Sequence, residues 1–368
     1  MEKNKGQLVL DVIARKNTSY LPSVINFANL AKKMECARHV GIDNEDDFDR
    51  YLGNHIKFTV QLDDVASHDW TDPYKLEVAL ASGRTRLNTE TGRLIDPWGL
   101  QFNPNATSYF NYGHPLAGIE ENPGILETYQ SPSLIDMDLL FGVAVEDLKK
   151  YGDEYLMYVS GYNGIWEKAY DLVGIEEFMY LLATETATAE KLMDLITDYK
   201  VEIARETIRR GFKIGHHGDD LGTQISTLIS EEMFVTLLKP RIKRIFDVYK
   251  SSGIPVQMHS CGYITPFIPH LIEIGLDVLE PVQPCMDISF LKREYGKDLT
   301  FYGGIDTQDL LAFRSPQEIR TETLRTIDIL GSGGGYICAP AQEIMDNVPP
   351  ENVAAVVAAL REARDNRF

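Results

Sequence analysis

Eight short apolar runs recur along the chain, and helical patterns lie between the later ones. The runs are residues 22–27, 56–62, 155–162, 212–220, 255–262, 277–283, 299–306 and 334–341. Strands that alternate with helices are typical of βα units, in which the strands pair in parallel. Eight such runs predict an α/β fold, a (β/α)8 TIM barrel, built as a single domain over residues 1–368.

An insertion over residues 67–150 interrupts this rhythm. Alternating polarity and the turn between Asn88 and Gly92 predict an antiparallel hairpin there. An irregular segment follows, and it would form a lid if it folded over the strand ends. Ordinary packing of the insertion on the barrel is the simpler interpretation. The rings of this predicted cap belong to Trp98, Phe102, Tyr109, Phe110, Tyr112 and His114.

Polar side chains gather where the predicted strands end, whereas the strand beginnings are apolar. In a TIM barrel the catalytic residues lie at the carboxyl ends of the strands, so these residues are the candidates for chemistry. In chain order they are Asp63, Asp64, Tyr162, Asn163, Asp219, Asp220, His259, Cys261, Glu280, Gln283, Asp306 and Cys338.

His259 and Cys261 are the most informative of these candidates. Residues two apart in a strand point to the same side, so the two side chains can converge on one point. If Cys338 ends a neighbouring strand, one imidazole and two thiolates result, which is a zinc site with one position left for substrate. The alternative interpretation is a buried histidine beside two buried thiols, because free cysteine is often buried.

Charge and cysteine usage exclude several classes of partner and compartment. The chain has 55 acidic and 36 basic residues, a net charge of -19, which argues against a nucleic-acid partner. Four cysteines are too few for a disulfide framework and favour a reducing compartment. The first residues lack a secretory pattern, and no apolar run reaches the length of a membrane span. We therefore expect a soluble, cytoplasmic protein without a membrane partner.

Four segments carry a resemblance to a known family. GDDLGTQISTLISEEMF, MHSCGYITPFIPHLIEIGLDVLEPVQP, FYGGIDTQDLL and GGGYICAPAQEIMDNVPPENV resemble the uroporphyrinogen decarboxylase superfamily. The resemblance implies a (β/α)8 barrel with its site at the carboxyl ends of the strands. One branch of the superfamily decarboxylates a porphyrinogen without a cofactor. The other uses zinc to move methyl groups between small molecules and a corrinoid protein.

The chain is more similar to the zinc branch, which includes the methylcobamide:coenzyme M methyltransferases and corrinoid O-demethylases. That branch carries His-x-Cys and a second cysteine far downstream, and here 77 residues separate Cys261 from Cys338. The arginine-rich segment that decarboxylases carry near the N-terminus has no counterpart here. Convergent arginines would be needed to bind the carboxylates of a porphyrinogen.

The resemblance implies a cofactor set and roles for particular residues. Zn²⁺ would be held by His259, Cys261 and Cys338, and a corrinoid (cobalamin) would be carried by a partner protein. The substrate would be a small methylated molecule, such as a methoxyaromatic, methanol or a methylthiol, or a thiol that accepts the methyl group.

Other residues are assigned less directly. Glu280 is the first candidate for a fourth ligand, and Asp219 or Asp220 is the second. The alternative roles for these carboxylates are hydrogen bonding to His259 or capping of the following helix. The predicted substrate contacts are Tyr162, Asn163, Asp63 and Gln283. Two alternatives stay open, a cofactor-free carboxy-lyase and a non-catalytic barrel that binds a corrinoid or another ligand. The methyl donor, the direction of transfer and a homodimeric state are left open as well.

Overall fold

The computed structural model describes most of the chain, with gaps concentrated in the inserted region. The described residues are 4–16, 19–59, 77, 80–81, 85–103, 113–129, 132, 137–159, 161 and 163–367. Asp63, Asp64 and Tyr162 lie outside these ranges, as do Tyr109, Phe110 and Tyr112 of the predicted cap.

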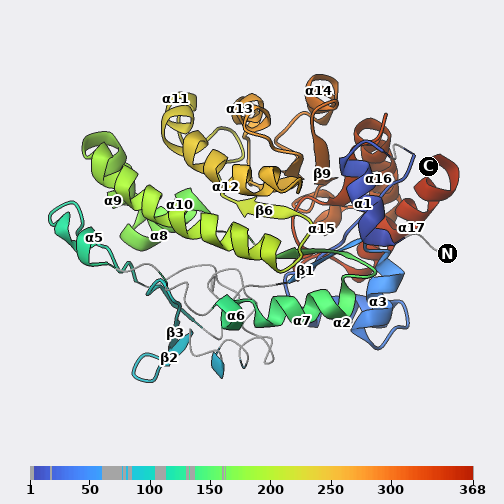
Figure 1. Ribbon diagram of the computed structural model, residues 1–368. Helices are drawn as coiled ribbons and strands as arrows, with labels where there is room; N and C mark the ends of the chain where they lie inside the picture. Colours follow the sequence, from blue (N-terminus) through green and yellow to red (C-terminus); the bar gives the residue numbers. More distant parts are fainter. Residues whose placement is uncertain are drawn as a thin grey trace.

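Parallel strands form the centre of the molecule (Figure 1). Five of them pair in the order β10-β9-β8-β7-β6 and two more pair as β1-β5, all in parallel. The predicted parallel α/β fold is therefore confirmed. The bounds are β1 Ile56–Thr59, β5 Leu156–Val159, β6 Gly215–Gly218, β7 Val256–His259, β8 Val278–Val282, β9 Thr300–Ile305 and β10 Tyr336–Pro340.

The predicted first strand, residues 22–27, is extended but is not a regular strand. It forms isolated parallel bridges, Ser23 with Cys338 and Phe27 with Ile344. Ile25 instead turns its backbone toward the side chain of Asn54, which accepts its N–H at 2.9 Å and donates to its carbonyl at 3.2 Å. The Asn54 side chain thus takes the place of a neighbouring strand at this point.

Two further backbone contacts link the sheets. The His55 N–H donates to the Ser23 carbonyl at 3.0 Å, and the Gly218 N–H donates to the Gly161 carbonyl at 2.8 Å. Within the described part of the chain, the strands fall into separate sheets joined by these contacts rather than into one continuous eight-stranded sheet.

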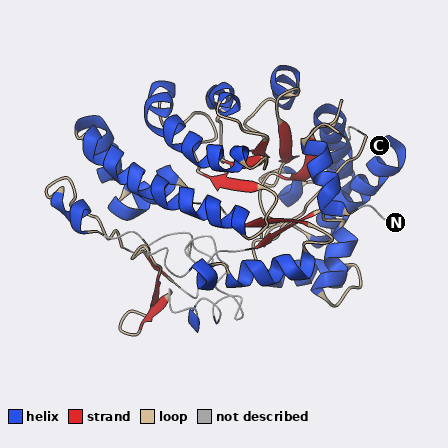
Figure 2. Ribbon diagram, in the orientation of Figure 1, coloured by secondary structure: helices blue, strands red, loops and turns tan. Residues whose placement is uncertain are grey.

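Helices cover the outside of the strands (Figure 2). The pairs α10 with α12 and α16 with α17 pack side by side in this layer. None of the described helices is both long enough and apolar enough to cross a membrane. The helix bounds are α1 Lys5–Ile13, α2 Leu30–His39, α3 Glu45–Leu52, α5 Gly124–Thr128, α6 Met137–Leu140, α7 Gly142–Tyr151, α8 Ile165–Val173, α9 Ile175–Thr184, α10 Thr186–Arg209, α11 Glu231–Met233, η1 Phe234–Leu238, α12 Lys239–Ser251, η2 Thr265–Phe267, α13 Ile268–Glu273, α14 Ile288–Tyr295, α15 Leu310–Phe313, α16 Pro316–Leu330 and α17 Pro350–Arg367.

Two buried clusters follow from the alternation of side chains along the strands. Ile337 and Ala339 of β10 join an inner cluster that also contains Tyr158 of β5 and Tyr302 of β9. Cys338, between them in sequence, belongs to the larger cluster that includes most of the buried helix residues. The inner cluster therefore marks the side of the strands that faces the interior of the barrel-like arrangement.

The inserted region contains a small antiparallel sheet of β2 (Arg86–Asn88), β3 (Arg93–Ile95) and β4 (Gln101–Phe102). Gly92 has a φ of 68°, a backbone conformation that the turn requires and that glycine adopts without strain. Trp98 of the predicted cap is buried and packs edge-on against Tyr199 of α10, with ring centroids 5.0 Å apart. This ring contacts the helical layer.

Candidate metal centre

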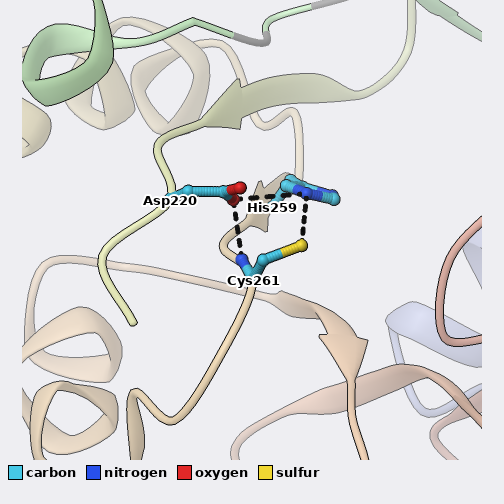
Figure 3. A group of neighbouring side chains, drawn as sticks. All are labelled: Asp220, His259 and Cys261. Atoms are coloured by element: carbon cyan, nitrogen blue, oxygen red, sulfur yellow. Dashed lines mark hydrogen bonds and ion pairs between the residues drawn. The ribbon is translucent and has the colours of Figure 1, made fainter. Parts of the chain in front are cut away.

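Three side chains with metal-binding atoms converge beyond the carboxyl ends of β6 and β7 (Figure 3). One ligand atom each from Asp220, His259 and Cys261 lies within 4.8 Å of the other two. Nε2 of His259 is 3.4 Å from Sγ of Cys261 and 3.5 Å from Oδ1 of Asp220. The predicted convergence of His259 and Cys261 is therefore present in the structure.

The backbone holds this group together at two places. The Cys261 N–H donates to Oδ1 of Asp220 at 2.7 Å, which ties the loop after β7 to the loop after β6. The two loops touch at Gly222 and Gly262, where a side-chain carbon on Gly262 would lie 2.3 Å from the Gly222 backbone. Gly262 also has a φ of 85°, so this close approach requires glycine there.

The donor set and its spacing fit a zinc ion. Zinc accepts imidazole nitrogen, thiolate sulfur and carboxylate oxygen in a tetrahedral arrangement. Its usual bond lengths put neighbouring ligand atoms about 3.3–3.6 Å apart. The two distances from Nε2 of His259 fall in that range. Three protein ligands leave one position open, which is the arrangement of catalytic rather than structural zinc.

Cys338, which was predicted as the third ligand, lies outside this group. It pairs with Gly303 in the β10-β9 ladder and is fully buried on the side away from Ile337 and Ala339. Burial raises the pKa of its thiol to about 12, although contact with Tyr336 and the charge of Arg364 oppose that shift. The structure therefore places the Cys338 thiol on the side of β10 that faces away from the barrel interior.

Glu280 lies behind His259 rather than among the ligand atoms. Its Oε1 is 3.5 Å from Nδ1 of His259, and its Oε2 is 3.2 Å from Nε2 of His216. Burial alone would raise the pKa of this carboxyl, but hydrogen bonding to both histidines and their charges hold the pKa well below its usual range. The placement supports orientation of His259, not direct coordination as a fourth ligand on the side of Nε2.

Asp219 and Asp220 are neighbours in sequence but lie in different surroundings. The buried Asp219 carboxylate accepts three backbone N–H groups, from Ile165, Trp166 and Glu167, each at 2.9 Å. These groups open α8, and a carboxylate at a helix N-terminus is stabilising. Asp219 therefore anchors α8, which leaves Asp220 as the carboxylate of the candidate metal centre.

Two glutamine side chains surround the sulfur of Cys261. Gln283, predicted as a substrate contact, donates from Nε2 to Sγ at 3.5 Å and to the Ala341 carbonyl at 3.3 Å, and its Oε1 accepts the Gly262 N–H at 2.6 Å. Gln342 donates to the same sulfur at 3.3 Å. Sequence reasoning missed Gln342, because a glutamine in a loop carries no pattern that would indicate a contact with sulfur.

The remaining predicted contacts cannot be placed at the centre. Asn163 is buried with a φ of 56° and donates from Nδ2 to Oδ2 of Asp171 at 2.9 Å, so it contacts α8. Asp63 and Tyr162 lie outside the described residues.

Negative charge accumulates around the group. The half-buried Glu167 lies in the first turn of α8, and burial raises its pKa well above the usual range, with the carboxylates of Asp220 and Asp219 adding to the shift. Burial lowers the pKa of His259, but Cys261 and Glu280 outweigh burial, so the pKa is raised well above its ordinary value. Neighbouring negative charge causes the His259 shift and adds to the Glu167 shift, and a bound cation would offset that charge.

Comparisons with known proteins identify a family and similar proteins. Residues 139–363 match the family uroporphyrinogen decarboxylase (URO-D). A methylated-thiol–coenzyme M methyltransferase of Methanosarcina mazei is 24% identical over 229 residues, 61% of this chain and 58% of that protein. The methylcobamide:CoM methyltransferase MtaA of Methanosarcina barkeri is 22% identical over 204 residues, 55% of this chain and 58% of that protein. The chain thus spans somewhat less than two thirds of the length of these relatives.

A solved structure supports the fold. A methyltransferase from Methanosarcina mazei superimposes with a TM-score of 0.67, covering 98% of this chain and 99% of that chain at 18% identity.

Proposed function

The chain belongs to the uroporphyrinogen decarboxylase (URO-D) family, and from that premise we propose that it is a zinc-dependent methyltransferase that works with a corrinoid. Asp220, His259 and Cys261 would hold the zinc. The observation that carries the proposal is the convergence of their ligand atoms within 4.8 Å, beyond the ends of β6 and β7. The methyltransferase names of the two curated relatives support it.

The metal would supply Lewis acidity, which lowers the pKa of a bound thiol or makes a methyl-bearing heteroatom a better leaving group. The protein's own residues would position it. Glu280 faces Nδ1 of His259 and leaves Nε2 toward Asp220 and Cys261. N–H groups of Gln283 and Gln342 point at the sulfur of Cys261 and would hold that sulfur in place for a bound metal.

The substrate class follows from the relatives' names and from the open fourth position. A thiol or a methylated thiol is the first candidate, because a soft sulfur suits zinc and one relative acts on methylated thiols. Methoxyaromatics and methanol are the further candidates. The second reactant would be a corrinoid on a partner protein, because the cobalt of the corrinoid carries the methyl-transfer chemistry. Transfer in either direction uses the same ligands.

The test combines metal content with methyl transfer. Protein purified without oxygen should contain about one zinc per chain by elemental analysis. Cys261→Ala should lose most of that zinc. Cys338→Ala is the matched control, a cysteine that lies on the other face of its strand, and it should keep the zinc.

Activity is measured with free methylcobalamin and a small thiol, by the change in cobalamin absorbance. Transfer by the parent and by Cys338→Ala, but not by Cys261→Ala, is the expected result. A folded parent without zinc, or one that decarboxylates a porphyrinogen in the presence of a chelator, would overturn the proposal in favour of a cofactor-free carboxy-lyase.

A further inference from the structure

His216 and His217 are adjacent on β6, yet they face opposite sides of the sheet. His216 lies among inner side chains, with its ring centroid 6.1 Å from that of Phe58 and 5.9 Å from that of Tyr158. His217 packs against Phe246 of α12 at 6.3 Å. Both imidazoles are buried. The two residues therefore differ in surroundings while sharing residue type, strand and burial.

The protonation of His216 follows from the direction of one hydrogen bond. The backbone N–H of Gly161 donates to Nδ1 of His216 at 2.9 Å. A backbone N–H can only donate, so Nδ1 must accept and carries no hydrogen. The single hydrogen of the neutral ring is then on Nε2, which is 3.2 Å from Oε2 of Glu280. His216 is thus a donor to Glu280.

The backbone approach behind this bond depends on glycine. A side-chain carbon on Gly161 would lie 2.0 Å from the carbonyl oxygen of His216. Another residue at position 161 would therefore have to move the strand apart. The close approach of the backbone at Gly161 therefore fixes the orientation of the His216 ring.

A second donor reaches the same carboxylate oxygen. The Tyr158 hydroxyl donates to Oε1 of Gln257 at 2.6 Å, which turns the amide nitrogen of Gln257 toward Oε2 of Glu280, to which it donates. With Oε2 occupied by His216 and Gln257, Oε1 is the oxygen that faces Nδ1 of His259, at 3.5 Å. The carboxylate therefore accepts on the His259 side.

We propose that His216 is a positioning residue for the candidate metal centre, and this inference rests on the proposed function for its use in catalysis. By fixing Glu280, His216 places the hydrogen of His259 on Nδ1 and leaves the lone pair of Nε2 directed at Asp220 and Cys261. A histidine that binds a metal through one nitrogen needs the other nitrogen to donate to a fixed acceptor. His216 is the residue that fixes that acceptor from the barrel interior.

The matched test compares His216→Leu with His217→Leu, and adds His216→Gln. Leucine removes the donor to Glu280, whereas a glutamine amide can restore it. Zinc affinity is measured by competition with a chelator. The ring tautomer of His259 is measured by ¹⁵N NMR on metal-free protein, at a pH above the raised pKa of its imidazole so that the ring is neutral. Circular dichroism and thermal unfolding check that each variant is folded.

In the metal-free parent, with the ring neutral, we expect His259 to carry its hydrogen on Nδ1. His216→Leu should mix the two tautomers and weaken zinc binding about 10- to 100-fold, the usual cost of removing a partner that orients a metal-binding histidine. His216→Gln should recover most of that loss. His217→Leu should leave both the tautomer and the zinc affinity within about threefold of the parent.

Each outcome has a separate meaning. A parent with the His259 hydrogen on Nε2, or equal losses in His216→Leu and His217→Leu, overturns the positioning role of His216 even if the parent binds zinc and transfers methyl groups. If the parent shows the expected tautomer but binds no zinc, His216 still orients His259. The proposed function is then the part that is overturned. The NMR measurement on the parent decides the inference even if His216→Leu does not fold.

Discussion

The inner and outer faces of the parallel sheet carry the same residue types in opposite roles. Inward lie His216 and His259, with the carboxylate of Glu280 between them. Outward lie His217 against Phe246, and Cys338 near Arg364. Both faces are buried, so burial does not separate them. The two faces differ in the neighbours of each side chain. On the inner face, the polar side chains contact one another in a continuous series that ends at Cys261.

The side of the sheet on which a residue lies, rather than its type, therefore determines whether it can take part in the candidate metal centre. A cysteine on the inner side or beyond the strand end reaches the candidate metal centre, and a cysteine on the outer side is a small apolar residue. The following predictions test that distinction, beginning with the largest expected effect.

The first contrast is between the thiols of Cys261 and Cys338. In metal-free protein at about pH 8, we expect iodoacetamide to modify Cys261 at least about 100-fold faster, because thiolate character and access control the reaction. Cys261 is half-buried, whereas Cys338 is fully buried with its pKa raised to about 12. Peptide mapping by mass spectrometry measures both rates. Added zinc should protect Cys261, and comparable rates at the two cysteines would contradict the assignment of faces.

A second contrast separates Asp219 from Asp220. Asp220→Asn should weaken zinc binding about 10- to 100-fold and leave stability nearly unchanged. Asp219→Asn should keep zinc binding but lower the free energy of unfolding by about 2 kcal/mol, because an amide can no longer accept all three N–H groups of α8. Chelator competition and urea unfolding measure the two effects. Loss of zinc in both variants would mean that the carboxylates share one role.

The third contrast concerns the two amides at the sulfur of Cys261. Gln283→Leu removes three polar contacts and Gln342→Leu removes the one that reaches Cys261. We expect about a tenfold loss of metal affinity in the first variant and about a threefold loss in the second. Substituting Co²⁺ for zinc lets the sulfur-to-metal absorption band report on the same bonds. Equal losses would argue against a graded effect of hydrogen bonding.

The last contrast is an alkaline loss of stability from the outer face. The pKa of Cys338 is raised from its ordinary value of 9.0 to about 12, so the folded state holds this proton more tightly than the unfolded state does. Its contribution to stability is therefore complete below about pH 9 and is lost as the pH rises toward about 12.

Urea unfolding at about pH 8 and about pH 11 measures this loss. Cys338→Ala should lose less stability over the same interval than the parent does. At about pH 8 the variant should be less stable by about 1 kcal/mol, because it removes a buried sulfur. An identical pH dependence in both proteins would show that Cys338 does not titrate differently in the two states.

The sequence was sufficient for the parallel fold and for the approach of His259 and Cys261. Apolar runs between helical patterns indicate parallel strands, and a spacing of two residues indicates a shared side near a strand end. Whether the strands join into one closed sheet could not be predicted from the sequence. Residues 22–27 pattern as a strand, but the Asn54 side chain occupies backbone groups of Ile25 that a neighbouring strand would need.

The side of β10 on which Cys338 lies could not be predicted from the sequence, for a specific physical reason. All five residues of β10 are buried, so its sequence shows no polar alternation that would tell the inner face from the outer. The placement of Glu280 behind His259 was hard to predict for a different reason. Its position at the end of β8 could be predicted from the sequence. Which nitrogen of His259 it faces depends on its contact with His216, a contact between strands that no local sequence pattern indicates.

The different roles of Asp219, at the start of α8, and Asp220, in the candidate metal centre, also have an evolutionary consequence. One carboxylate stabilises the fold, because α8 begins on it, and its neighbour would be needed only if a metal is held. A descendant that gave up the metal would be free to lose Asp220 while selection for a folded chain kept Asp219. The two adjacent acids would then be substituted at different rates among descendants, and only the residue at position 220 would show whether the metal had been kept.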